Sequence, residues 1–203
     1  MSLQRLVLVR HGETVGQSSI RYYGATDLPL SDSGREQMAR VRDALAGERF
    51  DGVYTSGLLR TIAAARIIAP DVPAHMMSGF NEINFGQWEG LTREEIAVRD
   101  PHRYREWRAS VHEFSYPDGD TVSAFRARVA ATMHAWVRRA PERALVIVHR
   151  GIISTFLSEL LQLTADKRAA LPIDLGSIHV LAARQGTWQA EVVNRTDHLE
   201  GLV

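Results

Sequence analysis

Two short runs of branched apolar residues constrain the fold of this chain more than any other feature. Residues 6–9 read LVLV and residues 144–148 read ALVIV, and neither run has the 3.6-residue period of a helix. Uninterrupted apolar runs of this length are typical of strands buried on both faces of a parallel sheet. Arg10 and His11 follow the first run, and His149 follows the second. In open α/β sheets ligands bind at the carboxyl ends of the strands, so these polar residues indicate a site.

Helices and strands alternate along the rest of the chain. Ser and Thr at N-cap positions, apolar residues at helical spacing, and Gly or Pro at the ends predict the helices. We expect helices from Ser31 or Ser33 to Gly47, within 56–70, from Thr92, over 120–139 and over 152–163. We expect further strands at 52–55 and 75–77, and a terminal hairpin of 177–183 and 187–193. This order predicts a single α/β domain over residues 1–203, a three-layer sandwich with a mostly parallel sheet and helices on both faces.

The composition limits the function classes. The 24 Lys and Arg residues equal the 24 Asp and Glu residues, and the pI is near 7.1, which argues against a surface built for nucleic acid or an anionic membrane. The sequence contains no cysteine, which excludes disulfides, thiolate metal sites and a cysteine nucleophile. No run approaches the ~20 apolar residues of a membrane span, and no targeting segment is recognisable, so we expect a soluble cytoplasmic protein.

Two further charged residues can reach the same sheet edge. Arg60, in TSGLLRT, lies one turn into the helix that follows residues 52–55, and with Arg10 it provides two guanidinium forks for an anion. Glu82 lies in the glycine-rich and aromatic stretch FNEINFGQWEG, where partial burial would raise the pKa of its carboxyl group. Glu13 and Glu89 are the alternative acids. A glycine that leads from a strand into a helix also presents backbone N–H groups to a phosphate.

Five ordered blocks of the sequence resemble the histidine phosphatase superfamily, also called the phosphoglycerate mutase-like family. The blocks are RHGET, YGATDLPLSDSGREQ, TSGLLRT, Glu82 with FGQWEG, and VIVHRG. The resemblance runs from about Leu6 to Ile153, and the last 50 residues fit only by their expected secondary structure. It implies a phosphoglycerate mutase-like fold.

The resemblance also implies a mechanism. His11 would be the nucleophile that becomes a phosphohistidine, and Glu82 would be the general acid and base. Arg10, Arg60 and His149 would hold the non-bridging phosphate oxygens. An unperturbed histidine titrates near ~6.5, and neighbouring arginines should lower the pKa of His11 so that its ring is neutral at neutral pH. The implied enzyme is a phosphatase that acts on a small phosphorylated metabolite without a metal or a cofactor.

Three other positions near the motifs are candidate phosphate-binding residues. Gly12 lets a phosphate approach the backbone. Gln17 stands where the family commonly has asparagine, and we expect the same amide contact with a longer reach. Arg150 stands where the family commonly has glycine, and its side chain either adds a charge to the pocket or points away and pairs with a surface acid.

Substrate choice and reaction type stay open in the sequence. The basic segment 99–108 either binds a second phosphate or a carboxylate on the substrate, or is a solvated helix whose aromatic residues pack on the domain. A phosphoglycerate mutase is the main alternative, although the family's mutases are longer and carry a basic insertion. YPDGDTVSAF is similar to a Pro-Gly-Gly-Glu-Ser stretch of phosphatase members, with Asp120 and Thr121 as conservative replacements, and favours a phosphatase.

Two more distant alternatives remain. A phospho-ligand binding module that has lost catalysis would lack a member of the constellation, and all members are present. A metal hydrolase that uses His11 and His149 as ligands finds no His-x-x-x-His motif or carboxylate cluster in support. The oligomeric state is not indicated by the sequence.

Overall fold

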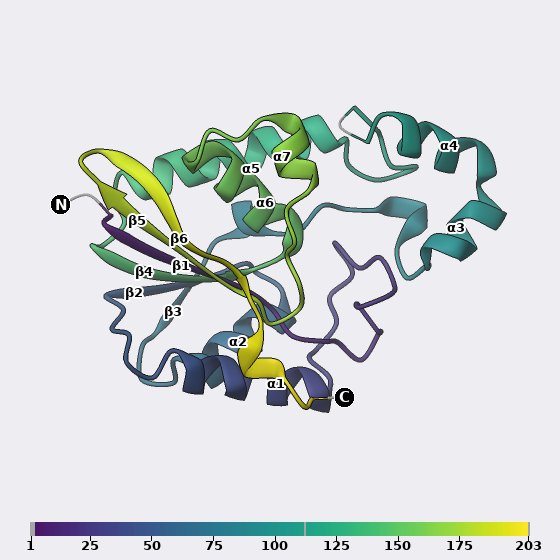
Figure 1. Cartoon of the computed structure of the whole chain (residues 1–203). Coiled ribbons are helices and arrows are strands. Elements are labelled where there is room, and N and C mark those ends of the chain that lie inside the picture. Colours follow the sequence, from purple (N-terminus) through teal and green to yellow (C-terminus); the bar gives the residue numbers. More distant parts are fainter. Residues whose placement is uncertain (1–2, 112, 203) are drawn as a thin grey trace.

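A central sheet separates two layers of helices in the computed structural model, which describes residues 3–111 and 113–202 (Figure 1). Among these residues the sheet has six strands in the order β3-β2-β4-β1-β5-β6. The strands are β1 (Arg5–Arg10), β2 (Gly52–Thr55), β3 (Ala74–Met76), β4 (Arg143–Val148), β5 (Ile178–Arg184) and β6 (Thr187–Arg195). The four strands from β3 to β1 are parallel to one another, and β5 and β6 form an antiparallel hairpin beside β1. The predicted mostly parallel sheet is confirmed.

Helices cover both faces of the sheet, as predicted (Figure 1). One face carries α1 (Asp32–Ala44) and α2 (Leu59–Ile68), and the other carries α5 (Val122–Val137), α6 (Arg150–Leu160) and α7 (Ala165–Ala169). Two short helices, α3 (Arg93–Arg99) and α4 (Pro101–Ala109), project beyond the sheet, and α4 has no buried residue. Single 3₁₀ turns lie at Ser78–Phe80, Gly86–Trp88 and Asp197–Leu199.

Both faces of strand β1 are buried, and its side chains belong to two separate clusters of the hydrophobic core. Leu6 and Leu8 pack in the cluster formed with α5 and α6, and Val7 and Val9 pack in the cluster formed with α1 and α2. All four side chains are completely buried. Burying a Leu or Val side chain contributes about 1.5 to 3 kcal/mol, so this strand is held rigidly in place.

The registers of β1 and β4 bring their carboxyl ends to one level. Arg10 pairs with Val148, and the backbone N–H of His11 donates to the Val148 carbonyl at 3.0 Å. His11 and His149 therefore leave the sheet side by side.

Local capping follows the sequence signals closely. Ser31, rather than Ser33, caps α1 and accepts a hydrogen bond from the Gly34 N–H. Thr92 and Glu95 form the predicted capping box of α3. Helix α6 begins at Arg150, two residues before the predicted start at 152. The prediction was late because Arg150 and Gly151 in the first turn do not contribute to the apolar periodicity. No helix in the described part of the chain has the length and hydropathy that crossing a bilayer requires.

Candidate active site

Two histidine rings lie edge to face where β1 and β4 end. The ring centroids of His11 and His149 are 5.2 Å apart, with an angle of 65° between the ring planes. His11 is 4% exposed and His149 is 1% exposed. Burial of both rings lowers the pKa of each well below the usual value near 6.5, and the Arg60 charge lowers both further. Both rings are therefore neutral at pH 7.

The backbone determines which nitrogen of His11 carries the proton. Nδ1 of His11 lies 2.7 Å from the Gly12 carbonyl oxygen. Because a carbonyl oxygen only accepts, Nδ1 carries the hydrogen and donates it. The electron pair of the neutral ring is then on Nε2, for which the described residues provide no hydrogen-bond partner. The arrangement leaves a basic ring nitrogen free beside the sheet edge.

His149 is held in the opposite tautomer. Nε of Arg60 lies 3.3 Å from Nδ1 of His149, and because arginine only donates, this nitrogen accepts. Nε2 of His149 therefore carries the hydrogen, and it lies 2.8 Å from the Ser56 hydroxyl oxygen. His149 therefore directs an N–H group at Ser56, whereas Nε2 of His11 keeps a free electron pair.

Two guanidinium groups lie next to these rings. Arg60 is completely buried, and its Nη atoms donate to the carbonyl oxygens of Thr26 at 2.9 Å and Gly24 at 2.7 Å. With its Nε donated to His149, two of the five N–H groups of Arg60 remain for a ligand. Arg10 donates one Nη to the Ile173 carbonyl at 2.8 Å, and its buried Nε has no partner. Burial, and next the charge of Arg150, lowers the pKa of Arg10 to about 10, so it remains charged at pH 7.

Glu82 is the carboxyl group of this site. It is 8% exposed, and its two oxygens accept from the backbone N–H groups of Ile83 at 3.0 Å and Gly151 at 2.9 Å. Burial raises the pKa of Glu82 above its usual value, although these two hydrogen bonds and the arginines oppose the shift. A Cβ atom at position 151 would lie 2.5 Å from Oε1 of Glu82, so the approach of the carboxyl group to α6 depends on the glycine.

The two alternative acids have structural partners instead. Glu13 accepts from the Ser18 hydroxyl and from the backbone of Thr14 and Ser19. Burial acts to raise the pKa of Glu13, but the hydrogen bonds from the serines outweigh it and the pKa is lowered. Glu89 accepts from four backbone N–H groups, those of Gly24, Ala25, Thr26 and Phe85. Both carboxylates hold loops together.

A cavity of about 690 Å³ opens beside His11. Arg10, His11, Glu82, Arg150 and Gly151 all line it. Much of the remaining wall is aromatic or aliphatic, contributed by Tyr22, Tyr23, Phe85, Trp107, Val111, Tyr116, Val122 and Phe125. Arg60 and His149 lie directly behind this surface, within hydrogen-bond distance of each other.

The remaining candidate residues from the sequence lie in different places. Gly12 is buried, and a Cβ atom there would lie 2.5 Å from the Gly34 carbonyl of α1. Gln17 is exposed, has φ 62°, and is not among the residues that line the cavity. Arg150 lines the cavity and has no acidic partner in the described chain, which agrees with an added charge rather than a surface ion pair.

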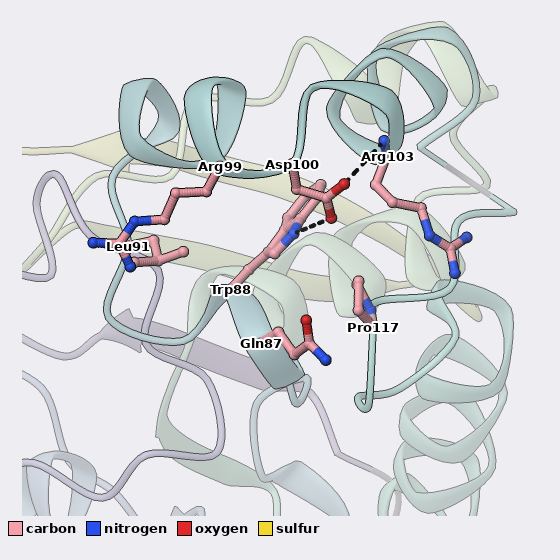
Figure 2. Close-up of a pocket in the computed structure, with 7 residues that line it drawn as sticks. All are labelled: Gln87, Trp88, Leu91, Arg99, Asp100, Arg103 and Pro117. Atoms are coloured by element: carbon pink, nitrogen blue, oxygen red, sulfur yellow. Dashed lines mark hydrogen bonds between the residues drawn. The ribbon is translucent and has the colours of Figure 1, made fainter.

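The basic segment 99–108 contributes to the cavity only through Trp107, among its described residues. Arg99 and Arg103 line a separate hollow, whose volume is about 500 Å³, together with Trp88 and Asp100. Figure 2 shows how these side chains lie. Asp100 accepts hydrogen bonds there from the Trp88 ring N–H and from the backbone N–H of Arg103.

Four cavity arginines, Arg21, Arg93, Arg126 and Arg168, and several aromatic residues of the cavity were not predicted from the sequence. Arg126 and Arg168 line the cavity from α5 and α7, and neither belongs to a motif. The sequence signal near Arg126 was the apolar stripe of α5, which describes the core face and not the neighbouring residue. No group of three or more His, Asp or Glu side chains within the described residues is arranged to hold a metal ion.

Comparison with known proteins agrees with this geometry. The sequence model described as "Histidine phosphatase superfamily (branch 1)" matches residues 6–196. An adenosylcobalamin/alpha-ribazole phosphatase of Escherichia coli K12 is 28% identical over 198 residues, which cover 94% of this chain and 91% of the relative.

A solved structure and a further relative extend the comparison. The crystal structure of a putative alpha-ribazole-5'-P phosphatase from Escherichia coli is similar with a TM-score of 0.86 at 27% identity, and the match covers 95% of this chain and 97% of that one. A 2,3-bisphosphoglycerate-dependent phosphoglycerate mutase 2 of Gloeobacter violaceus is 28% identical over 83% of this chain and 81% of its own length.

Proposed function

Because this chain belongs to the histidine phosphatase superfamily and is a phosphoric monoester hydrolase, we propose that it cleaves small phosphomonoesters through a phosphohistidine on His11. The observation that carries the proposal is the state of the His11 ring. The ring is buried and neutral, its proton is bound on Nδ1 by the Gly12 carbonyl, and its Nε2 electron pair is free. Attack on phosphorus requires such a nitrogen.

In the first step, Nε2 of His11 forms a bond to phosphorus while the bond from phosphorus to the ester oxygen breaks. Glu82 in its protonated form gives its proton to the leaving oxygen. Burial raises the pKa of Glu82, so a larger fraction of this carboxyl group is protonated than of an exposed glutamate. The hydrogen bond from Nδ1 to Gly12 keeps the ring oriented as it gains positive charge.

In the second step, water attacks the phosphorus of the phosphohistidine and gives a proton to the Glu82 carboxylate. The nitrogen–phosphorus bond breaks, its electron pair returns to Nε2, and inorganic phosphate leaves. Glu82 is protonated again, so the cycle closes without another proton donor.

We assign Arg10, Arg60 and His149 to the phosphoryl oxygens, where His149 would donate the Nε2 hydrogen that it directs to Ser56 in this structure. Arg10 lines the cavity and has N–H groups beyond the one donated to Ile173, and Arg60 keeps two N–H groups beyond those donated to the protein. These charges matter most in the transition state, where negative charge spreads over the oxygens. Removing one well-placed donor of this kind typically costs about 3 to 4 kcal/mol of transition-state stabilisation.

The test is phosphate release from p-nitrophenyl phosphate and a panel of metabolite monoesters in the presence of a chelator. We expect wild-type activity to survive chelation and His11→Ala to lose it. His134→Ala is the matched control, because His134 is an exposed histidine that contacts Glu159 away from the cavity. Acid-labile, alkali-stable labelling by a ³²P-substrate should appear in the wild type and the control and be absent from His11→Ala.

The same assays test the mutase alternative, which the similarity to a phosphoglycerate mutase brings in. Isomerisation of 3-phosphoglycerate without phosphate release would replace hydrolysis by mutase activity. Activity that persists in His11→Ala would refute the phosphohistidine.

A further inference from the structure

Three arginines line the cavity outside the group assigned to the phosphoryl oxygens. Arg126 comes from α5, Arg150 begins α6, and Arg168 comes from α7, so three separate elements place positive charge on the lining of one cavity. Arg126 and Arg168 are half-buried, and Arg150 is exposed.

None of the three has a protein partner. Within the described residues, Arg126, Arg150 and Arg168 form no ion pair and no side-chain hydrogen bond, and Nε of Arg168 is buried without an acceptor. Elsewhere in the molecule arginines are commonly paired. A carboxylate lies within 4.0 Å of Arg5, Arg21, Arg40, Arg42, Arg103, Arg128, Arg143, Arg184 and Arg195.

Arg126 and Arg168 repel each other, and Arg150 repels Arg10 of the group assigned to the phosphoryl oxygens. Burial, and next the charge of Arg168, lowers the pKa of Arg126, and the charge of Arg150 contributes to the lowered pKa of Arg10. Unpartnered like charges held together in a partly buried wall are unfavourable in the empty protein. A bound anion would be attracted to these arginines and would offset the repulsion between them.

The charge of the cavity exceeds what one phosphate requires. Six arginines line it, namely Arg10, Arg21, Arg93, Arg126, Arg150 and Arg168, against the two acids Glu82 and Glu94. Arg21 is paired with Glu95, and the Arg93 guanidinium lies 5.8 Å from the centre of the Trp107 ring. A phosphomonoester carries about −1.5 to −2 charges at pH 7, and the positive charges of Arg10 and Arg60 balance them. The α5–α6–α7 wall therefore retains positive charge for another group.

Resting on the proposed function, we propose that Arg126, Arg150 and Arg168 form a second anion subsite, so that the substrate is a phosphomonoester with a second acidic group. The planar guanidinium fork matches either a carboxylate or a second phosphate. The cavity is also lined by aromatic and aliphatic residues such as Phe125 and Val122, which suit a short carbon skeleton that joins the acidic groups.

Matched substrate pairs test this assignment. 3-Phosphoglycerate and glycerol 3-phosphate differ in a carboxylate against a hydroxymethyl group. Fructose 1,6-bisphosphate and fructose 6-phosphate differ in a second phosphate. We expect the wild type to prefer the doubly anionic member of at least one pair by tenfold or more in kcat/KM. A preference in the first pair alone identifies a carboxylate, and a preference in the second pair alone identifies a second phosphate.

Arg126→Gln and Arg168→Gln should each reduce that preference about tenfold, because a hydrogen bond to a charged group has roughly this value. Arg40→Gln is the control, because Arg40 is an exposed arginine of α1 paired with Glu36, and it should retain the wild-type preference. Calorimetric titration of His11→Ala with both members of each pair measures the same preference without turnover.

The outcomes separate the two proposals. Absence of p-nitrophenyl phosphate hydrolysis by the wild type would refute the proposed function itself. Hydrolysis that depends on His11, with equal kcat/KM for both members of each pair, would overturn the second anion subsite alone. A preference that survives in both glutamine variants would also overturn it.

Discussion

A single carbonyl group determines how His11 can react. The Gly12 oxygen accepts the Nδ1 hydrogen at 2.7 Å, which leaves the other ring nitrogen with its electron pair. Glu82, which lines the same cavity, has the opposite character, since burial favours its protonated form. A base and an acid are thus available in one cavity at the same pH, and each is set by its own surroundings.

At the residue scale, we expect Glu82→Gln to lower kcat/KM more for substrates with a basic leaving group than for substrates with an acidic one. We expect kcat/KM for an alkyl phosphate such as glycerol 3-phosphate to fall about 10² to 10⁴-fold, the usual contribution of a general acid. p-Nitrophenolate leaves without a proton, so kcat/KM for p-nitrophenyl phosphate should fall much less.

Steady-state kinetics with both substrates measure this difference, and Glu36→Gln on α1 is the exposed control. Equal losses for the two substrates would show that Glu82 does not protonate the leaving group.

Residues next to a motif could be predicted from the sequence, and isolated ones could not. His11, Arg60 and His149 each occupy a fixed position relative to a strand end, so their convergence followed from the topology of a parallel sheet. Gln17 has a left-handed backbone and is exposed, and no local pattern indicated that conformation. Arg168 reaches the cavity only through the position of the short helix α7, which has no buried residue and hence no apolar period.

At the element scale, the first turn of α6 positions the acid. The Gly151 N–H donates to Glu82, and the glycine leaves the space that the carboxyl group and the Phe125 ring occupy. This contact also shows why the predicted start of the helix was late. Apolar periodicity detects the face of α6 that packs on the sheet, whereas its first residues serve the cavity.

Gly151→Ala should therefore impair catalysis while the protein stays folded. The added methyl group would lie 2.5 Å from Oε1 of Glu82 and 2.9 Å from the Phe125 ring, so the carboxyl group must move. We expect a loss of about 10²-fold or more in kcat/KM for alkyl phosphates, since the acid loses its position.

Gly47→Ala is the matched control, because nothing lies within 4 Å of a Cβ atom there. Circular dichroism and kinetics on both variants measure the effect. Wild-type kcat/KM in Gly151→Ala would show that the contact between α6 and Glu82 is dispensable.

The regular elements were predictable for a different reason. The strands β1 and β4 and the helix α5 bury residues at the period of their own secondary structure, and that period is visible in the sequence. Helix α4 buries nothing, and its boundary depends on the Asp100 cap and Pro101 instead of a pattern. Sequence periodicity therefore predicted least well those helices whose ends are determined by capping residues alone.

At the scale of the whole molecule, buried neutral histidines make stability depend on pH. The pKa values of His11 and His149 are lowered well below 6.5, and burial lowers that of His179 to about 4. Below pH 6.5 these histidines bind protons in the unfolded chain but stay neutral in the folded chain, so the free energy of unfolding falls as the pH falls. Glu82, with its raised pKa, opposes this trend but is one group against three.

His179→Asn isolates one part of this dependence. His179 accepts from the Asn194 N–H through Nδ1, and an asparagine oxygen can accept the same hydrogen bond. The slope of unfolding free energy against pH should decrease by about 1.4 kcal/mol per pH unit between pH 6.5 and 4.

Urea unfolding at pH 7, 6 and 5 measures the slope, and His102→Asn is the control because the His102 side chain is 75% exposed. An unchanged slope in His179→Asn would show that this histidine is not held neutral.

The projecting helices have a consequence for how such an enzyme acquires new substrates. Five residues of this part of the chain line the cavity, namely Arg93, Glu94, Trp107, Val111 and Tyr116, while α4 has no fully buried residue and most of the core lies elsewhere. Sequence change at the exposed positions of α4 therefore has little effect on folding, whereas change in β1 or β4 displaces His11 and His149. Descendants of one ancestor can therefore diverge in the substrates they accept while they keep the same reaction. A mutant library confined to the lining residues Arg93, Glu94, Trp107 and Val111 would explore substrate range at nearly constant chemistry.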